Sequence, residues 1–546
     1  MSDRTCTFEL RPVSILEVKK LIKGLKNSSA TGVDFIDTRL IKSSVEILAP
    51  AIHHIINLSI STQTFPDVWK WHKVVPLLKG SDCDKLLPKS YRPVALLPVM
   101  SKLLEKAVFS QLVEYLENNQ LIHPNLHGSR TGHSTATALS QLYDTWMEEV
   151  EEGKMVGVLL CDQSAAFDLC DHLILIEKLR LMGVGDKAAS WFLSYLSGRK
   201  QSCMVDGHLS APEEIPQCGV PQGSIGGPIM WLIFTCDQPD VIHTHPIDRG
   251  SHDRGCSLSG NTCGTMVGYV DDGAFSFAHT DPVALSTVLS ETYAKLAEWM
   301  CSNRLVINAD KTHLLVMGTK KHSAKRRDVH LVAGGHVIRP SESEKLLGGH
   351  LHQSLDWRLH LRDHKASLLN QLIGRINGLK KVCAYADFQT RLTVANGVVI
   401  SKLSYLITLW GGSKQYLLNI LQVQQLTAAR LVCGFGSWKF SRRKLLDKVG
   451  WLSVRQLIFY HTVLQTHKTL ISRVPLHLYH SLNNDYQRVT RSAEAGNLRQ
   501  IIKCTSTFQY RAVKYYNSVP AEVRTGTLET VKKKLKKWTR NNIPLD

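Results

Sequence analysis

Several features that define large classes of proteins are missing from this sequence. No apolar run reaches the roughly 18 residues that a membrane-spanning helix needs, and residues 1–10 carry charge without an apolar core. The 13 cysteines include no Cys-x-x-Cys pair, which favours free thiols over a disulfide framework in a chain without an export signal. No internal repeat is present. We therefore expect a protein of the nucleus and/or cytoplasm with no membrane partner.

Acidic residues are scarce relative to basic ones. The chain of 546 residues has 47 Asp and Glu against 66 Lys and Arg, which gives a formal net charge of +19 at pH 7. Each Lys or Arg that approaches a phosphate releases a condensed counterion, so the excess indicates a polyanionic partner, either a nucleic acid or an acidic membrane surface. With 43% hydrophobic residues, the chain is long enough to bury several cores.

One group of Cys and His residues is the sequence's nearest approach to a zinc site. Cys256 and Cys263 lie near His243, His245 and His252. Their spacing matches no established zinc-ligand pattern. We expect no zinc.

Two adjacent acids, Asp271 and Asp272, lie between short runs of strand-favouring residues. Neighbouring side chains on a regular strand point to opposite faces, so the two acids can converge only if the chain bends, and Gly273 would permit that bend. The pattern predicts a tight hairpin over residues 268–275. Converging carboxylates are ligands for Mg²⁺ or Mn²⁺, although an Asp-Asp-Gly turn can equally be a solvated hairpin tip.

A second acid, Asp162, ends the apolar run of residues 157–161, which predicts a buried strand. A strand that delivers Asp162 beside a hairpin that delivers Asp271 is how a two-metal site is assembled, with ions roughly 3.5–4 Å apart.

These elements resemble the first and third palm motifs of reverse transcriptases, Asp-x-Ser-x-Ala-Phe-Asp at 162–168 and Tyr-x-Asp-Asp at 269–272. The string at 219–234 contains Pro-Gln-Gly, a further motif of that family, and lacks the Gly-Lys-Ser/Thr of a P-loop. The similarity is closest to the polymerases of non-LTR (LINE-type, jockey-like) retrotransposons and spans nearly the whole chain. Telomerase-like and group II intron-like polymerases share the chemistry, but Tyr91-Arg-Pro and Asp171-His172 fit LINE-type elements better.

The resemblance implies an α+β fold, that of a right-hand polymerase with fingers, an antiparallel palm sheet and a helical thumb. The expected segments are an N-terminal helical extension of the fingers (1–61), fingers (62–153), palm (154–345), helical thumb (346–439) and a basic C-terminal region (440–546).

The resemblance also implies a catalytic group. Asp162 and Asp271 would hold a metal ion that lowers the pKa of the primer hydroxyl, and Asp272 would be a weaker ligand or act through its neighbours. Lys311 resembles the family lysine that donates a proton to departing pyrophosphate. A surface lysine is the alternative at that position.

Five residues are expected to bind the nucleotide. Lys79 and Arg92 would neutralise the triphosphate, unless they are ordinary solvated cations. Phe167 stands where an aromatic ring blocks the 2′-hydroxyl of a ribonucleotide, although a lone Phe is more often core. Gln222 and Gly223 match the family's contacts to nucleotide and template, and glycine allows a close backbone approach.

Four residues are expected to contact the template or primer. Arg130 and Gly132 belong to a loop similar to the family loop that supports the template, although Ser129 replaces its usual aromatic residue. Leu347 and Gly348 lie in what looks like the small hairpin that grips the primer end.

Hydrophobic periodicity and turn residues predict the main elements. They are a helix over 14–25 capped by Ser14 and Glu17, a helix over 36–61, strands before residue 79 and from residue 91, helices over 101–118 and 281–301, a strand over 313–317, a largely helical stretch after Trp357 that breaks at 410–413, and a cationic amphipathic helix over 531–540.

The resulting hypothesis is an RNA-directed DNA polymerase that uses two Mg²⁺ (or Mn²⁺) ions, with an RNA template, a DNA primer and deoxynucleoside triphosphates as partners. The alternative is a catalytically silent or co-opted nucleic-acid-binding relic of such an element. No endonuclease module or C-terminal Cys/His knuckle is recognisable, so we expect extension of a supplied primer without nicking of plasmid DNA.

Overall fold

The computed structural model describes residues 7–27, 30–80, 83–163, 167–242, 264–307, 311–434, 439–483, 497–498 and 504–545, without the side chain of Asp162. The chain divides into two compact units. The first unit comprises residues 1–129, 163–241 and 295–308, and the second comprises 130–162, 242–294 and 309–546. The expected palm segment, 154–345, is shared between the units, and the division into five segments stays a prediction.

The first unit combines helices with a mixed sheet. Within its described residues the strand order is β2-β1-β4-β5, with β6 also paired to β4; β1 pairs with β2 antiparallel and with β4 parallel. Its elements are α1 (Ile15–Lys23), α2 (Thr38–Ser43), α3 (Val45–Thr62), η1 (Asp67–Trp69), β1 (Trp71–Leu78), η2 (Pro88–Ser90), β2 (Tyr91–Leu96), α4 (Val99–Asn118), α6 (His172–Leu181), α7 (Asp186–Leu196), β4 (Lys200–Val205), β5 (His208–Leu209), β6 (Glu213–Glu214), α8 (Gly226–Phe234) and η3 (Gln238–Val241).

The N-terminal helices follow the sequence prediction with one correction. The Ser14 hydroxyl accepts from the Glu17 amide, and the Glu17 carboxylate accepts from the Ser14 amide, so the expected cap of α1 is confirmed. The helix expected over 36–61 is wrong as a single helix, because the chain breaks at Ser44 into α2 and α3. Serine has a lower preference for helix interiors than for helix ends, which agrees with the position of the break, although the Ser44 side chain makes no capping bond.

The second unit is built on an antiparallel sheet with strand order β7-β8-β3-β9. This confirms an antiparallel sheet in an α+β fold. The elements of the sheet and its surroundings are α5 (Thr135–Glu151), β3 (Met155–Asp162), β7 (Gly264–Tyr269), β8 (Asp272–His279), α9 (Pro282–Ser302, whose last turns belong to the first unit), β9 (Thr312–Met317), η6 (Lys320–His322), α10 (Lys325–Asp328), β10 (Leu331–Ala333), β11 (His336–Ile338), β12 (Ser343–Leu346) and β13 (Gly349–His352).

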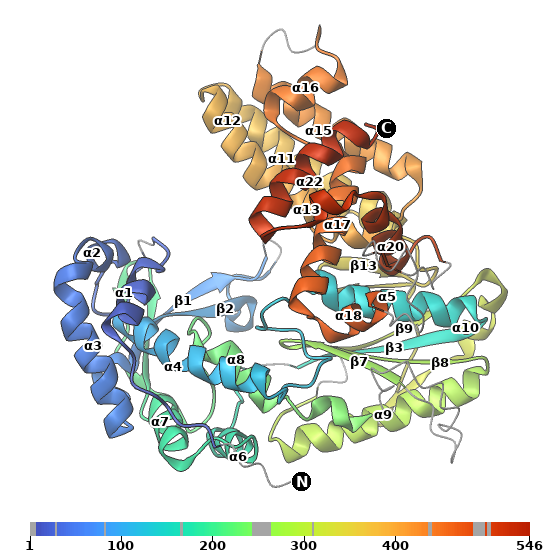
Figure 1. Cartoon of the computed structure of the whole chain (residues 1–546). Coiled ribbons are helices and arrows are strands. Elements are labelled where there is room, and N and C mark those ends of the chain that lie inside the picture. Colours follow the sequence, from blue (N-terminus) through green and yellow to red (C-terminus); the bar gives the residue numbers. More distant parts are fainter. Residues whose placement is uncertain are drawn as a thin grey trace. The chain divides into compact units, whose positions relative to one another are not determined.

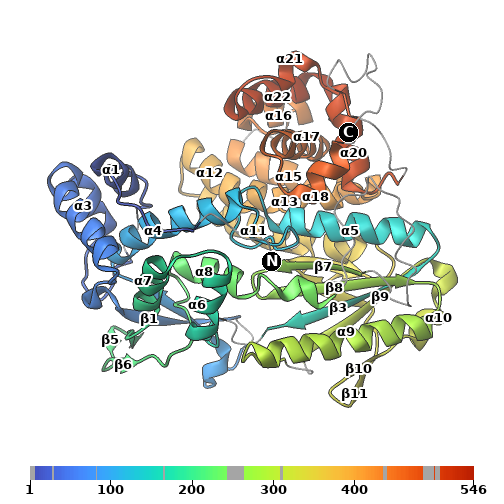
Figure 2. The ribbon, with the colours of Figure 1, turned by 60° about the horizontal axis from the view of Figure 1, so that its bottom comes forward.

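Helices cover both faces of this sheet. Leu139 and Trp146 of α5 join the apolar cluster that contains Val158 of β3. On the other face a Cβ at Gly157 would lie 2.7 Å from Leu289 of α9, so glycine allows that helix to pack closely. Figures 1 and 2 show α5 and α9 on opposite sides of the strands.

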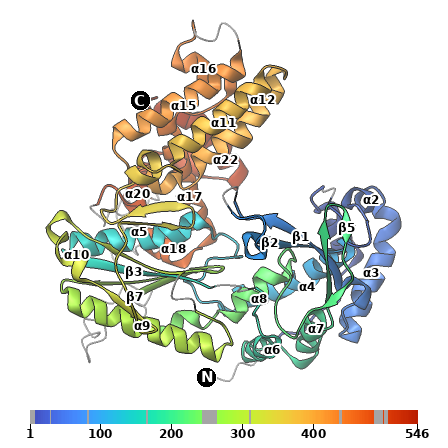
Figure 3. The same cartoon turned by 180° about the vertical axis from the view of Figure 1, so that it is seen from behind.

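The rest of the second unit is helical, as the sequence predicts after Trp357, and Figure 3 shows α11, α12 and α15 side by side. The elements are η7 (Leu359–Asp363), α11 (Leu368–Cys383), α12 (Phe388–Ala395), η8 (Asn396–Ile400), α13 (Ser401–Ser404), α14 (Ile407–Trp410), α15 (Gln415–Cys433), α16 (Arg442–Val449), α17 (Val454–Ser472), α18 (Leu476–Leu482), α20 (Phe508–Ser518), α21 (Ala521–Arg524) and α22 (Leu528–Asn542). α22 buries Val531 and Leu535 and confirms the expected cationic amphipathic helix.

A buried carboxylate ties the C-terminal helices to α5. Asp144 is 1% exposed and accepts hydrogen bonds from the amides of Phe508 and Gln509, at 2.9 and 3.2 Å. Arg511 lies buried nearby and donates to the carbonyl oxygens of Ser506 and Leu409. These contacts make α20 part of the core around α5.

No helix in the described part of the chain is both long enough and apolar enough to cross a lipid bilayer. The cysteines that the structure describes are free thiols, as expected. The Cys and His residues weighed as a zinc site fall within 243–263 and lie outside the described residues.

Candidate active site

The end of the four-stranded sheet in the second unit gathers the predicted acids. β3 ends at Asp162, and its backbone pairs with Asp272 at the start of β8. Asp272 also pairs with Tyr269, the last residue of β7, so only Val270 and Asp271 form the turn between these strands. Paired residues on neighbouring antiparallel strands have Cα atoms about 4.5–5.5 Å apart. The backbones of all three aspartates therefore lie at one end of the sheet.

The bend is not where the sequence placed it. Gly273 lies inside β8 and pairs with Gly268, whereas the left-handed φ of 59° belongs to Val270. A β-branched residue rarely adopts that conformation, because its side chain crowds the backbone. The hairpin is confirmed and the role given to Gly273 is wrong, since pairing extends to Tyr269 and Asp272 and leaves Val270 to make the turn.

Lys311 lies directly before β9, the strand on the other side of β3. It directly precedes Thr312, which pairs with Cys161, so its backbone lies at the same end of the sheet as Asp162. The Lys311 side chain is exposed. Burial raises the pKa of the neighbouring Cys161 thiol to about 12, which keeps that thiol protonated and uncharged at neutral pH.

The donor set at this sheet end fits a hard divalent cation. Asp271 and Asp272 are exposed carboxylates, and oxygen ligands of this kind suit Mg²⁺ and Mn²⁺. Among the side chains that the structure describes, no cluster of three His, Cys, Asp or Glu groups could hold a metal ion; the Asp162 side chain is not among them. The fit therefore rests on the backbone register and the chemistry of the acids.

Lys79 and Arg92 belong to the β1–β2 hairpin of the first unit. Leu78 pairs with Tyr91, and the amide of Lys79 donates to the carbonyl oxygen of Ser90 at 2.9 Å. Both cationic side chains are exposed, and the Lys79 ammonium donates to the carbonyl oxygen of Lys89 at 2.8 Å. The predicted hairpin is confirmed, and it presents two cations beside one loop.

Phe167 is held against the core of the first unit. Its ring centroid lies 5.9 Å from that of the buried Trp231 on α8, at 31° between planes. Its carbonyl oxygen accepts from the amide of Val220 at 2.7 Å. These two contacts fix both the ring and the backbone of Phe167 beside the residues that precede Gln222.

Gln222 and Gly223 lie in the loop that precedes α8, and this loop contacts β2. The carbonyl oxygen of Gln222 accepts from the amide of Ala95 at 2.7 Å. Gly223 has a φ of 133°, and a Cβ there would lie 2.4 Å from the Ala95 carbonyl oxygen, so only glycine fits. The Gln222 amide lies 3.5 Å from an Asp168 carboxylate oxygen.

The loop with Arg130 and Gly132 leads into α5. Gly132 has a φ of 78°, and a Cβ there would lie 2.5 Å from the side chain of Val474, which lies between α17 and α18. Ser134 caps α5 by accepting from the amide of Thr137. The loop is thus fixed at both sides within the second unit.

Leu347 and Gly348 form the turn between β12 and β13, with left-handed φ values of 46° and 77°. The Leu347 carbonyl oxygen accepts from the Tyr405 hydroxyl at 2.6 Å. This confirms the expected hairpin and joins it to the helices that follow.

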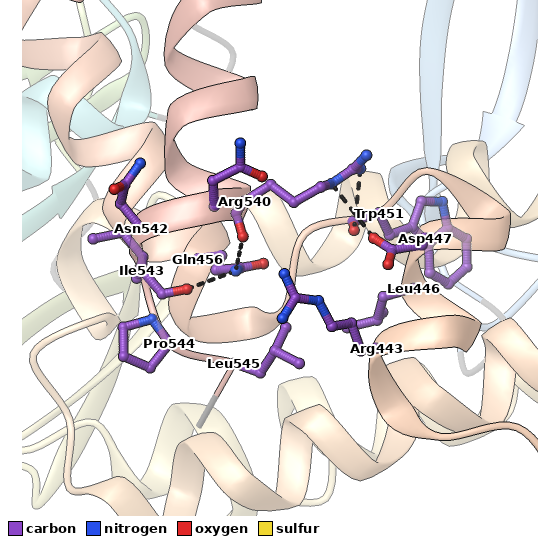
Figure 4. A pocket seen from close by; sticks show the side chains of 11 residues that line it. Arg443, Leu446, Asp447, Trp451, Gln456, Arg540, Asn542, Ile543, Pro544 and Leu545 are labelled. Carbon is purple, nitrogen blue, oxygen red and sulfur yellow. Dashed lines mark hydrogen bonds and ion pairs between the residues drawn. The ribbon is translucent and has the colours of Figure 1, made fainter.

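The C-terminal helices of the second unit enclose a polar hollow (Figure 4). Its volume is about 240 Å³, and it is lined by α16, the start of α17 and the end of α22. Gln456 donates to the carbonyl oxygens of Arg540 and Ile543 and holds the end of α22 in place. Arg443 and Arg540 are the two cations among the residues that line the hollow. None of the predicted site residues lines this hollow.

The structure thus brings Asp162, Asp271, Asp272 and Lys311 to one sheet end, and it places the predicted template and primer loops in the same second unit. The predicted nucleotide contacts belong to the first unit: Lys79, Arg92, Phe167, Gln222 and Gly223.

Three residues that support these loops were given no supporting role from the sequence, in which Asp171-His172 counted only as a LINE-type string. Glu105 binds the start of α8, His172 donates through Nε2 to the Gly219 carbonyl oxygen at 2.8 Å, and Asp171 caps α6 and pairs with Arg304 at 2.6 Å. Asp171 carried a local signal, because Asp commonly caps a helix. The partners of Glu105 and His172 are remote in sequence and left no such signal.

Comparison with known proteins agrees with these motifs. The family described as "Reverse transcriptase (RNA-dependent DNA polymerase)" matches residues 78–351. The RNA-directed DNA polymerase from mobile element jockey of Drosophila funebris is 26% identical over 471 residues, which cover 85% of this chain and 49% of that protein. The probable RNA-directed DNA polymerases from transposon BS and transposon X-element of Drosophila melanogaster are 25% and 23% identical over 430 residues, covering 78% of this chain in each case and 45% and 44% of those proteins. The chain spans about half the length of these relatives.

Proposed function

Because the chain belongs to the reverse transcriptase (RNA-dependent DNA polymerase) family, we propose that it is the RNA-directed DNA polymerase of a non-LTR retrotransposon. It joins deoxynucleotides to a primer 3′-hydroxyl that is paired with an RNA template. The observation that carries this proposal is the gathering of Asp162, Asp271, Asp272 and Lys311 at one end of an antiparallel sheet. The similarity to polymerases of jockey, BS and X-element supports the retrotransposon assignment.

In this proposal the primer 3′-oxygen forms a bond to the α-phosphorus as the bond from that phosphorus to pyrophosphate breaks. Two Mg²⁺ or Mn²⁺ ions, when bound, supply Lewis acidity at the attacking hydroxyl and at the phosphates. Asp162 and Asp271 would hold the ion at the hydroxyl, with Asp272 as a weaker ligand. The Lys311 ammonium offers a proton to the leaving pyrophosphate and offsets its negative charge.

The remaining predicted residues select and hold the substrates. Lys79 and Arg92 bind the triphosphate, which their exposure on one hairpin supports. Phe167 excludes the 2′-hydroxyl of ribonucleotides, and its fixed ring on Trp231 supports that role. Gln222 and Gly223 contact the nucleotide and its template base.

The template and primer bind the second unit in this proposal. Arg130 and Gly132 support the template backbone, and the turn at Leu347 and Gly348 grips the primer end. The fingers comprise 62–153 after the helical extension 1–61, the palm 154–345 and the thumb 346–439. The basic region 440–546 contacts phosphate, for which the cationic face of α22 is the support.

Primer extension on a homopolymer RNA template tests the proposal. The purified chain, given an annealed DNA primer, the complementary deoxynucleotide and Mg²⁺, should lengthen the primer, and EDTA should stop the reaction. Lengthening that continues after the metal is chelated would contradict the two-metal site. Tight binding of the primer and template without any lengthening would instead favour a relic that binds nucleic acid.

A further inference from the structure

Glu105 is a fully buried carboxylate between α4 and the start of α8. Its side chain is 0% exposed. One carboxylate oxygen accepts from the amides of Ile225 and Gly226, at 2.7 and 3.2 Å, and the other accepts from the Ser101 hydroxyl at 2.9 Å. A buried charge without partners would be strongly destabilising. The complete set of partners therefore fixes the start of α8 relative to α4.

The start of α8 depends on this carboxylate for its first two amides, because the local cap at Ser224 engages only the amide of Gly227. The N-cap residue Ile225 makes no side-chain capping bond. The Ser224 hydroxyl accepts from the Gly227 amide at 2.8 Å. Glu105 and Ser224 together engage the first amides of α8, which would otherwise lack partners. Since these amides are engaged, the helix start is not a free phosphate site of the kind that helix N-termini often form.

The loop that this helix start holds is the Pro-Gln-Gly loop, residues 221–223. It runs directly into α8 and is bound on its other side by β2, through the Ala95 amide and the Gln222 carbonyl oxygen. The close approach at Gly223 leaves no space for the loop to shift toward Ala95. A displaced α8 start must therefore move Gln222 or break its bond to β2.

A buried cation completes the surroundings of Glu105. Arg199 is 1% exposed and donates to the Tyr195 carbonyl oxygen at 2.9 Å, and its guanidinium lies 5.1 Å from the Tyr195 ring centroid. Burial raises the pKa of Glu105, while the Arg199 charge and the hydrogen bonds to Ser101, Gly226 and Ile225 oppose that shift. The hydrogen bonds from the Ile225 and Gly226 amides can form in either protonation state of Glu105, as long as one of its oxygens reaches α8.

We propose that Glu105 is the positioning residue of the Pro-Gln-Gly loop: by capping α8 it holds Gln222 and Gly223 where they contact the incoming nucleotide. This inference rests on the proposed function. Glu105 itself touches no substrate, so it acts through the position of Gln222. Its loss should weaken nucleotide binding far more than the binding of primer and template.

Two conservative substitutions distinguish the effect of side-chain length at position 105 from the effect of its charge. Glu105→Gln keeps the length of the side chain, so its carbonyl oxygen can accept from both amides while its NH₂ group donates to Ser101. Glu105→Asp keeps the charge but withdraws the carboxylate from α8 by one methylene. Glu114→Gln and Glu114→Asp, at an exposed position of the same helix, are the matched controls.

Steady-state primer extension with varied deoxynucleotide then gives KM and kcat, and a binding titration gives the Kd for primer–template. For Glu105→Asp we expect KM to rise at least about tenfold while the Kd stays within about threefold of wild type. For Glu105→Gln and both controls we expect KM within about threefold of wild type. Circular dichroism and thermal unfolding confirm that each variant is folded.

The outcomes are distinct. If the wild-type chain does not extend primers, the proposed function fails and this inference fails with it. If the wild type extends but Glu105→Asp leaves KM unchanged, or lowers primer–template binding in parallel, only the positioning role is overturned. Should Glu105→Asp fail to fold, Ser224→Ala removes the other cap of α8; a rise in KM alone supports the role, and an unchanged KM overturns it.

Discussion

Asp144 should make the stability of the second unit depend on pH, in the direction opposite to that of a surface carboxylate. The side chain lies between α5 and the start of α20, where the amides of Phe508 and Gln509 donate to it. Burial raises the pKa of this carboxyl from 3.8 to about 7, although the two amides and the charge of Arg511 favour the ionised form. The folded protein therefore holds this proton more tightly than the unfolded chain does.

The sign and size of the effect follow from that difference. Because the folded-state pKa is raised, the stabilisation from protonated Asp144 is fully present below about pH 4 and is lost as the pH rises through about 7. The pKa difference of about three, at about 1.4 kcal/mol for each unit, amounts to about 4 kcal/mol as an order of magnitude. Above about pH 8 the carboxyl is ionised in both states and the dependence ends.

The substitution Asp144→Asn removes the titration and keeps one acceptor oxygen. Urea unfolding of both proteins, followed by tryptophan fluorescence and by hydrogen exchange in α20, gives the free energy of unfolding at each pH. The value for the variant minus that for wild type should rise by about 1.4 kcal/mol per pH unit between about pH 5 and 7 and then level off. Taking the difference cancels the other titrating groups.

Asp387→Asn is the matched control. Asp387 is an exposed cap of α12, whose hydrogen bonds from Thr390 lower its pKa. The contribution of Asp387 to the free energy of unfolding is present above its ordinary pKa and is lost only in more acidic solution. The difference in that free energy between Asp387→Asn and wild type should therefore be constant between about pH 5 and 8. A flat curve for Asp144→Asn over the same range would refute the reasoning about burial.

Three further substitutions test the active site. Asp271→Asn should lower the rate of extension by about a thousandfold, because a lost metal ligand costs several kcal/mol in the transition state, at about 1.4 kcal/mol per factor of ten. RNA binding should stay within about tenfold of wild type. The control Asp281→Asn, at an acid beyond the opposite end of β8, should leave extension intact. Phe167→Ala should admit ribonucleotides in a competition assay, whereas Phe167→Tyr should not, and equal discrimination in both would place the gate elsewhere. Gly223→Ala should abolish extension with primer–template binding retained, because the new Cβ collides with the Ala95 carbonyl oxygen; normal extension would show that the loop adapts.

Local signals explain why so much of the fold could be predicted. Three of these signals lie entirely within one element: the reciprocal cap at Ser14 and Glu17, the apolar run before Asp162, and the alternation of lysines with Val531 and Leu535. Hydrophobic period and capping residues act over a few positions, so they can be recognised without knowing what packs against them. The strand and hairpin patterns indicated Asp162, Asp271 and Asp272, whereas Lys311 was indicated by the family resemblance.

What could not be predicted depends on partners remote in sequence. Gly273 was the better turn residue by intrinsic preference, yet strand pairing placed the left-handed φ on Val270. The sequence around Glu105 predicts only an amphipathic helix, because the amide that it caps lies 120 positions away. Asp144 is separated from Phe508 by 364 positions. Such contacts form only in the folded chain and produce no periodic pattern in the sequence.

Both units contain the same arrangement at Glu105 and Asp144. In each, a fully buried carboxylate from one helix accepts from the first amides of another helix, Glu105 at α8 and Asp144 at α20. An anion is stabilised at a helix start by the amides and the helix dipole together, so the arrangement binds remote segments while it satisfies groups that burial would otherwise leave unpaired. It also removes those two helix starts as sites for phosphate. In the proposed reaction, side-chain cations such as Lys79 and Arg92 would bind the phosphates together with the metal ions, which agrees with the excess of Lys and Arg over acids in this chain.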